Sequence, residues 1–413
     1  MKPWPIVLLA LWSGLALAEP LPGLPPDEIV RLALQDHPDT LAAASEVDRE
    51  TANRDRLTAG EYEWNLSIGG QQRRTRPPGS VNENFKEWNL TLERPLRLPD
   101  KAATDAEIGA SGIIRAKTAF GDTIHETKRD LLKSWFAWLK ASANAEEWAA
   151  QVELIERQTR TINRRLQLGD AARRDSVQAE AALAQAEAQA VQAAAQREAA
   201  HATLRRRYPA LARVEPDAIG EPPALAGSDE EWLAAVAEHS HELALARQQT
   251  RLAELAAMRQ RQERRPDPSV GLAFSSERGG EEQVVGAFVR IPLPGGARQA
   301  AERSAAAAAA AARYREAALI RQIDLNTATV THAARSAYAA WQVSHRAAKE
   351  LEQAARMAGQ AYQLGEGSLH DWQSALRQAH EAHVAARGNQ LEALEQRYRL
   401  QLDAEQIWQF GEE

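Results

Sequence analysis

Four short segments of the chain alternate apolar with polar residues, which is typical of β-strands with one apolar face. The apolar positions are Trp64, Leu66, Ile68, Trp88, Leu90, Leu92, Val270, Leu272, Phe274, Val285 and Val289. Polar stretches at 73–84 and 277–281, rich in turn-forming residues, separate the members of each pair. The sequence therefore predicts two β-hairpins. Their strands are about 10 residues long, the length of a tilted membrane-crossing strand.

A long segment with helical periodicity follows each hairpin, at 101–168 and at 297–364. As single helices, these segments would each be about 100 Å long. Apolar residues spaced alternately by four and three predict coiled-coil packing along both. The first such series is Trp148, Val152, Ile155, Thr159, Ile162 and Leu166, and the second runs from Trp341 to Tyr362. Shorter helices are expected at 27–59, 175–207, 228–264 and 371–408. In the second of these, small residues at Val177, Ala181, Ala184, Ala188 and Val191 suggest close helix packing.

The second half of the chain repeats the plan of the first. Each long segment ends in Gln-Leu followed by glycine and an acid, and an aspartate stands six residues after the glycine. The repeated positions are Gly169, Asp170 and Asp175, then Gly365, Glu366 and Asp371. Glycine accepts the left-handed conformation that ends a helix, and aspartate caps a helix start. We therefore expect two helical hairpins, with a first repeat at 19–227, including a Pro/Gly-rich segment at 208–227, and a second at 228–413.

Composition limits the cellular location and the chemistry. Lys2, the apolar run from Ile6 to Leu17 and the small residues Ala16 and Ala18 predict a signal peptide at 1–18. The chain contains no cysteine, so it has neither a disulfide nor an N-terminal cysteine to be lipidated. Its net charge of −7 argues against nucleic acid as the main partner. No later segment is apolar enough for a membrane-spanning helix.

No catalytic motif is recognisable, and we expect a protein that is not an enzyme and needs no cofactor. The sequence lacks a phosphate-binding glycine loop, a nucleophile elbow and a His-Glu-x-x-His zinc motif. His370, His380 and His383 lie close together, but three nearby histidines do not by themselves form a metal site. We expect solvated histidines and no bound metal.

The direction of the chain places both hairpins at one end of the long helices and both Gly-acid turns at the other. Four strands cannot close a barrel, and open strand edges are not tolerated in lipid. The chain is therefore expected to oligomerise, and three copies would supply twelve strands. Membrane lipid would then contact the apolar face of the strands.

Over its mature length the sequence resembles the TolC-type outer-membrane efflux proteins. The resemblance lies in the duplicated Leu-Gly-acid turns, the hairpins ending in Pro95-Leu96 and Pro292-Leu293, and the alanine-rich return helix around Gln178. It implies a mainly α-helical homotrimer in which both repeats form one channel, with a 12-stranded outer-membrane β-barrel and a long periplasmic coiled-coil tunnel. It also implies a passive exit duct that docks to a periplasmic adaptor and an inner-membrane pump.

In this interpretation the helical turns form the tunnel tip that meets the partner. The residues expected there are Gly169, Asp170, Asp175, Ser176, Gly365, Glu366, Asp371 and Trp372. Two alternatives remain open. One is an outer-membrane channel for type I protein secretion, and the other is a soluble periplasmic coiled-coil scaffold or adaptor. The duplicated hairpins argue against the second alternative, because adaptors carry a single helical hairpin.

Overall fold

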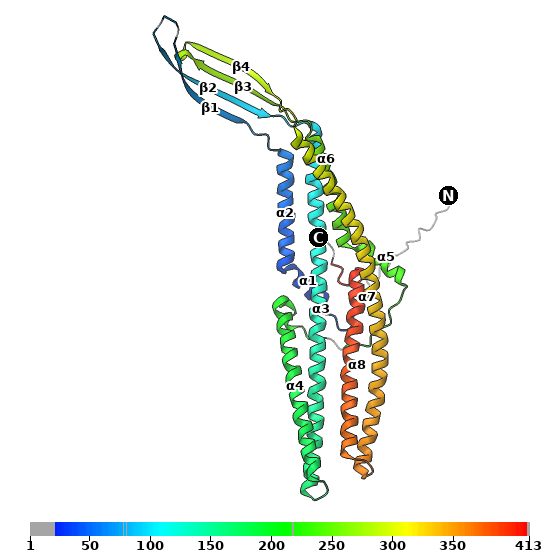
Figure 1. Cartoon of the computed structure of the whole chain (residues 1–413). Coiled ribbons are helices and arrows are strands. Elements are labelled where there is room, and N and C mark those ends of the chain that lie inside the picture. The colour runs from blue at the N-terminus through cyan, green and yellow to red at the C-terminus, as the bar shows by residue number, and fades with distance from the viewer. Residues whose placement is uncertain (1–20, 77, 80, 217–218, 411–413) are drawn as a thin grey trace, which may run out of the picture. The chain divides into compact units, whose positions relative to one another are not determined.

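The computed structural model describes residues 21–76, 78–79, 81–216 and 219–410, so the predicted signal peptide lies outside the described residues. The elements, in chain order, are α1 (Asp27–Gln35), α2 (Pro38–Ala59), β1 (Asn65–Thr75), β2 (Glu83–Pro95), α3 (Pro99–Gln167), α4 (Arg173–Arg207), η1 (Pro209–Arg213), α5 (Asp229–His239), α6 (His241–Gln262), β3 (Ser269–Glu277), η2 (Arg278–Gly280), β4 (Glu282–Arg290), α7 (Gly296–Leu364) and α8 (Leu369–Asp403). The mainly helical class with a small β part is confirmed (Figure 1).

The chain forms two compact units, and α3 contributes to both. One unit contains residues 34–137 and 224–413, and the other contains the described part of 1–33 together with 138–223. The larger unit holds the whole sheet, α2, all of α5 to α8 and the first part of α3. The smaller unit holds the hairpin that the end of α3 forms with α4. The predicted division into repeats at 227/228 stays a prediction.

All four strands form one antiparallel sheet in the order β1-β2-β3-β4. Its register aligns the apolar residues of neighbouring strands: Leu66 faces Leu92, Leu92 faces Leu272, and Leu272 faces Ala287. The predicted hairpins and their apolar face are therefore confirmed. The expected first loop was too long, since β1 extends to Thr75 and includes Arg73 and Arg74.

Prolines and glycines set the ends of the long helices, as the pattern predicted. Pro95 is the last residue of β2, and Pro99 is the first residue of α3. Both α3 and α7 are 69 residues long, or about 100 Å. In the larger unit, α3 and α7 begin at the sheet, where α2 and α6 end, whereas the turn between α7 and α8 lies at the opposite end (Figure 1).

Two of the shorter helical segments are divided. The helix expected at 27–59 breaks before Pro38, where the Nδ1 atom of His37 accepts a hydrogen bond from the Asp39 backbone N–H at 3.3 Å. The segment expected at 228–264 breaks at Ser240, whose hydroxyl caps α6 by accepting from the Leu243 N–H at 3.1 Å. Each break occurs where a side chain can satisfy the free N–H groups of a new helix.

The helical hairpins pack through small residues. Between α7 and α8 the predicted series is confirmed, because Trp341, Ala348 and Ala355 are buried at heptad spacing. In the α3–α4 hairpin, Ile162 and Thr159 are buried, and the Thr159 hydroxyl lies 3.3 Å from the carbonyl oxygen of Ala179. Because these buried residues include small side chains, the helix backbones can approach closely along both hairpins.

The small-residue series predicted on α4 is not the face that packs against α3. The residues buried against α3 are Ser176, Ala179, Ala186 and Ala193. The expected face, which begins at Val177 and ends at Val191, points away from α3, and these two valines are 55% and 71% exposed. Alanine occurs on several faces of this helix, so the sequence pattern fits more than one heptad register.

A buried ionic network joins the sheet to the helices beneath it. The fully buried Lys101 ammonium lies 3.1 Å from Glu263 and 3.2 Å from Asp267. Asp267 also accepts hydrogen bonds from the Tyr62 hydroxyl at 2.9 Å and from the Leu98 N–H at 3.1 Å. Because a buried charge must be compensated, this network fixes the positions of the segments that enter and leave the sheet.

Candidate functional site

The sheet presents one apolar face that is left uncovered by the described residues of the larger unit. Ile68 is 75% exposed, and Leu66, Leu272, Val285 and Val289 on the same face are also exposed. We call these exposed apolar residues the apolar belt. Tryptophans lie at both of its ends. Trp64 precedes β1 at the helix end, and Trp88 lies level with Gly70, towards the hairpin loop. From Trp64 to Gly70 the belt is about 20 Å long, measured along the strand at 3.3 Å per residue, and aromatic side chains flank it as they flank the lipid-facing band of a membrane barrel.

The opposite face of the sheet is polar and cross-linked by charges. The Arg73 guanidinium lies 3.0 Å from Glu87 and 2.9 Å from Glu277, so it joins three strands. Near the helix end, Arg290 lies 2.6 Å from Glu93. An apolar face backed by a hydrated, charged face is the arrangement of a barrel wall between lipid and a water-filled lumen.

Both outer edges of the sheet are open within one chain. β1 pairs on one side only, with β2, and β4 pairs on one side only, with β3. Their other sides carry backbone N–H and C=O groups that need partners if the sheet enters a membrane. In a ring of such sheets, the β4 strand of one copy would lie antiparallel to β1 of the next. The same edges make a solitary copy unsuited to lipid.

The turns of the two helical hairpins have the predicted glycine geometry. Gly169 and Gly365 have φ values of 87° and 79°, in the left-handed region. The predicted capping role of the two aspartates is wrong. Each aspartate lies at the third position of its helix, and the cap residues are Ala172 and Ser368. The Ser368 hydroxyl accepts from the Asp371 N–H at 3.1 Å and donates to the Asp371 carboxylate at 2.6 Å.

The other predicted tip residues divide into exposed and packed groups. Asp170 and Glu366 are exposed on their turns. Ser176, by contrast, is buried in the α3–α4 hairpin and donates to Asn163 at 2.6 Å. Trp372 stacks on Tyr362 across the α7–α8 hairpin with ring centroids 5.2 Å apart, and its ring packs over Gly359. Each predicted set thus gathers at its own hairpin turn.

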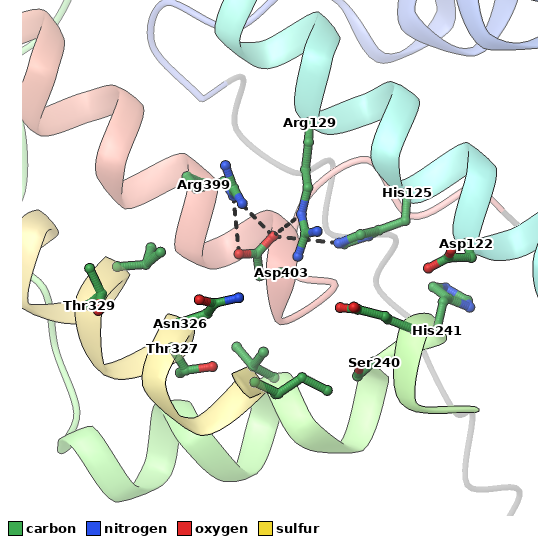
Figure 2. A pocket seen from close by; sticks show the side chains of 14 residues that line it. Asp122, His125, Arg129, Ser240, His241, Asn326, Thr327, Thr329, Arg399 and Asp403 are labelled. Carbon is green, nitrogen blue, oxygen red and sulfur yellow. Dashed lines mark hydrogen bonds and ion pairs between the residues drawn. The ribbon is translucent and has the colours of Figure 1, made fainter. Parts of the chain in front are cut away.

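A polar cavity of about 250 Å³ lies in the larger unit, where α3, α7, α8 and the α5–α6 junction meet. Figure 2 shows Asp403 on one side of it, surrounded by three cationic or ionisable side chains. Arg129 donates to Asp403 at 2.7 Å, Arg399 at 3.2 Å, and the His125 Nε2 atom lies 3.5 Å away. This cluster could not be predicted from the sequence, because its members come from distant positions and form no local motif.

Opposing effects set the pKa values of Asp403 and Asp122, two carboxyls that line this cavity. Burial raises the pKa of Asp403, but the hydrogen bond with His125 and the charges of Arg129 and Arg399 outweigh it, so this pKa lies below its usual range. Across the cavity, burial and then the charge of Glu126 raise the pKa of Asp122. Asp403 is therefore ionised at neutral pH, where it pairs with both arginines.

Of the three histidines singled out in the sequence, His380 is not solvated. It is 7% exposed on α8, and burial, followed by the charge of His383, lowers its pKa to about 4. His370 is exposed, and His383 lies 3.5 Å from Glu352. Within the described ranges, the structure shows no group of three or more acidic or histidine side chains that could hold a metal.

Acidification is expected to weaken the α7–α8 hairpin through His380. An unfolded histidine takes up a proton near pH 6.5, whereas the folded one does so only near pH 4, so stability falls as the pH decreases through this window. Between pH 8 and pH 5 the loss should be about 2 kcal/mol. Hydrogen exchange of the hairpin amides measures it. His380→Gln should abolish most of this pH dependence and His370→Gln should retain it; equal behaviour of the two variants would refute the assignment.

No helix within the described parts of the chain is both long enough and apolar enough to span a membrane. No protein-family model matches the sequence, and a search of curated proteins found no match. Solved structures do match. The outer membrane protein VceC of Vibrio cholerae is 16% identical with a TM-score of 0.74, and the match covers 92% of this chain and 95% of VceC.

Two further solved structures have the same architecture. The CmeC outer membrane channel of Campylobacter jejuni is 14% identical with a TM-score of 0.72, over 92% of this chain and 85% of CmeC. A membrane protein from Pseudomonas aeruginosa is 16% identical with a TM-score of 0.70, over 94% of this chain and 97% of that protein. The chain thus has the fold of the outer-membrane channels that its sequence resembles.

Proposed function

We propose that this chain is the outer-membrane exit duct of a tripartite efflux system. Three copies form a channel that conducts solutes passively once it is docked to a periplasmic adaptor and an inner-membrane pump. The observation that carries this proposal is the four-stranded sheet, with one exposed apolar face, one charged face and two open edges, at the end of helices of 69 residues.

The sheet requires other copies of the chain if it enters lipid. Four strands are too few to close, and eight is the usual minimum for a membrane barrel. Three copies would supply twelve strands, an even number that suits antiparallel closure. The lumen would then be lined by the Arg73–Glu87–Glu277 and Arg290–Glu93 contacts.

Exposed apolar residues along the helices support the same assembly. In α7, Leu325, Val343 and Met357 are exposed, and in α4 the face that includes Val177 and Val191 is left uncovered. Monomeric soluble proteins rarely leave extended apolar surfaces on several elements. Neighbouring copies would cover these surfaces in a helical tunnel, and the Gly169 and Gly365 turns would form its tip.

Substitutions at Gly365 can distinguish a role of this turn in docking from a role in folding. Gly365 has open space around the position of a Cβ atom, but its φ of 79° is strained for a β-branched residue. We expect Gly365→Val to destabilise the turn by about 1–2 kcal/mol and to reduce efflux more than it reduces the amount of protein in the membrane. Drug or solute accumulation assays, normalised to membrane protein, measure this effect.

Gly365→Asn is the matched control, because asparagine tolerates the left-handed conformation. It should retain most of the efflux. If the valine variant instead lost protein and efflux in equal proportion, the turn would have only a structural role.

Membrane fractionation together with conductance tests the proposal as a whole. The mature chain should be found in the outer membrane as a heat-sensitive oligomer, and the purified oligomer should open conducting pores in a lipid bilayer. A water-soluble periplasmic pool without pores would support the scaffold alternative instead. Secretion of a large protein substrate would favour a type I secretion channel.

A further inference from the structure

Two basic residues interrupt the apolar face of the sheet at its loop end. Arg74 in β1 and Lys86 in β2 lie on the same face as Trp88 and Leu90, because side chains two residues apart along a strand share a face. The register pairs Arg74 with Asn84 and Lys86 with Gln72, so the two cations are diagonal neighbours. Diagonal side chains are about 7–8 Å apart at the backbone, within reach of one ligand.

These two residues differ from the arginine beside them. Arg73 points to the polar face, where Glu87 and Glu277 neutralise it. Arg74 and Lys86 are exposed, and within the described part of the chain neither forms an ion pair with a carboxylate. Arg74 donates only to the neutral Asn84 side chain, at 3.1 Å. The alternation of the strand thus leaves two positive charges on the apolar face.

Their height along the sheet is defined by the tryptophan girdle. Lys86 lies two residues beyond Trp88, or about 7 Å further towards the loop, and Arg74 lies beyond Lys86. Tryptophan side chains mark the boundary between hydrocarbon and headgroups. If the belt lies in a membrane, the ammonium and guanidinium groups are at the level of the lipid phosphates.

Among the described residues, the helix end of the same face has no comparable pair. Its basic residue, Arg94, lies over the Trp64 ring at 5.5 Å and donates to the Tyr62 carbonyl oxygen at 3.0 Å. Arg94 is therefore already engaged by an aromatic ring and a carbonyl group. The two ends of the apolar belt differ in the positive charge that they offer to lipid.

We propose that Arg74 and Lys86 form a binding site for the phosphate groups of anionic lipid in the leaflet around the hairpin loops. This inference rests on the proposed membrane location. A guanidinium binds a phosphate through two parallel hydrogen bonds, and the lysine ammonium adds a second point charge. One phosphate between the two side chains, or two phosphates of one lipid, satisfies both charges.

The test uses the purified full-length mature protein in nanodiscs of phosphatidylcholine with and without phosphatidic acid. Native mass spectrometry counts the lipid molecules that the released oligomer retains. Each cation near a charged lipid surface contributes about a fivefold preference, so Arg74→Gln combined with Lys86→Gln should reduce phosphatidic acid retention roughly 25-fold. The wild-type preference should also weaken as salt is added.

A second pair of substitutions serves as the control. Arg303→Gln with Arg315→Gln removes the same charge from exposed positions of α7 and should leave lipid retention unchanged. In pure phosphatidylcholine the Arg74/Lys86 variant should have the thermal midpoint of the wild type, which shows that it is folded.

Three outcomes would overturn the inference. The first is equal phosphatidic acid retention by the wild type and the Arg74/Lys86 variant, and the second is an equal loss in the control. The third is displacement of the lipid by millimolar inorganic phosphate, which would indicate a site for free anions. Failure of the wild type to enter phosphatidylcholine bilayers at all would overturn the proposed function, and the lipid site with it.

Discussion

Ile68→Arg is expected to prevent most of the protein from entering the membrane. Ile68 is 75% exposed in the middle of the apolar belt, opposite Leu90 in the register. An arginine facing lipid at the middle of a membrane barrel costs about 2–4 kcal/mol, so three copies would cost roughly 6–12 kcal/mol. Fractionation should move the variant from the membrane to soluble or degraded material, with loss of the heat-sensitive oligomer.

Ser67→Arg is the matched control, because it introduces the same side chain at the next residue. Ser67 lies on the polar face, as does Arg73, where a charge would be hydrated in the lumen. This variant should insert like the wild type. If the two variants distributed equally between fractions, the assignment of the faces to lipid and lumen would be wrong.

Asp403→Asn is expected to destabilise the protein by about 2–3 kcal/mol. This is below the range for a fully buried ion pair, because Arg399 is partly exposed and Arg129 keeps its ion pair with Glu126. Asp403 is buried at the end of α8, and the substitution leaves Arg129, Arg399 and His125 without the carboxylate that they share. Beside it, Leu400 and Ala404 belong to a hydrophobic cluster with Trp232. Loss of the charge should therefore loosen the junction of α3, α5 and α8.

The measurement is chemical or thermal unfolding of the oligomer, compared with Asp324→Asn at an exposed position of α7. The control should change stability by less than about 0.5 kcal/mol. Because the pKa of Asp403 is lowered on folding, the advantage of the wild type should persist above pH 3.8 and disappear as the pH falls below it. A loss below about 1 kcal/mol would show that the cluster is dispensable.

The strands and the long helices were predictable because local rules determine them. Period-two alternation placed Leu66, Leu92 and Leu272 on one face, and the structure aligns them across three strands. Proline and glycine then fixed the ends of α3 and α7. Such rules need no knowledge of distant contacts.

Other features depend on contacts that the local pattern does not specify. Alanine-rich α4 has several similar faces. The face that packs against α3 contains Ala179 and Ala186, and the local pattern does not distinguish it from the predicted series. At the second turn the helix cap is Ser368 and not Asp371, because the serine lies directly before the first residue of α8. Likewise, the surroundings of His380 could not be predicted without knowing which face of α8 packs on α7.

The low sequence identity to VceC and CmeC agrees with this distinction between features set by local sequence patterns and features set by distant contacts. A fold built from periodic apolar faces and turn glycines can be retained while most residues change, because many side chains satisfy the same pattern. Charged clusters such as Arg129–Asp403 and exposed pairs such as Arg74–Lys86 are not required by that pattern. They are features of this chain that need separate tests.

In the proposed channel, β4 of one copy pairs with β1 of the next until three copies close the barrel. Because the chain contains no native cysteine, disulfide cross-linking between the strands tests it directly. One cysteine replaces Ser67 in β1, and a second is scanned along β4. The expected result is a ladder of covalent dimer and trimer in membranes that ends at the trimer. Cross-links confined to single chains at every β4 position, or a ladder that continues beyond three copies, would contradict it.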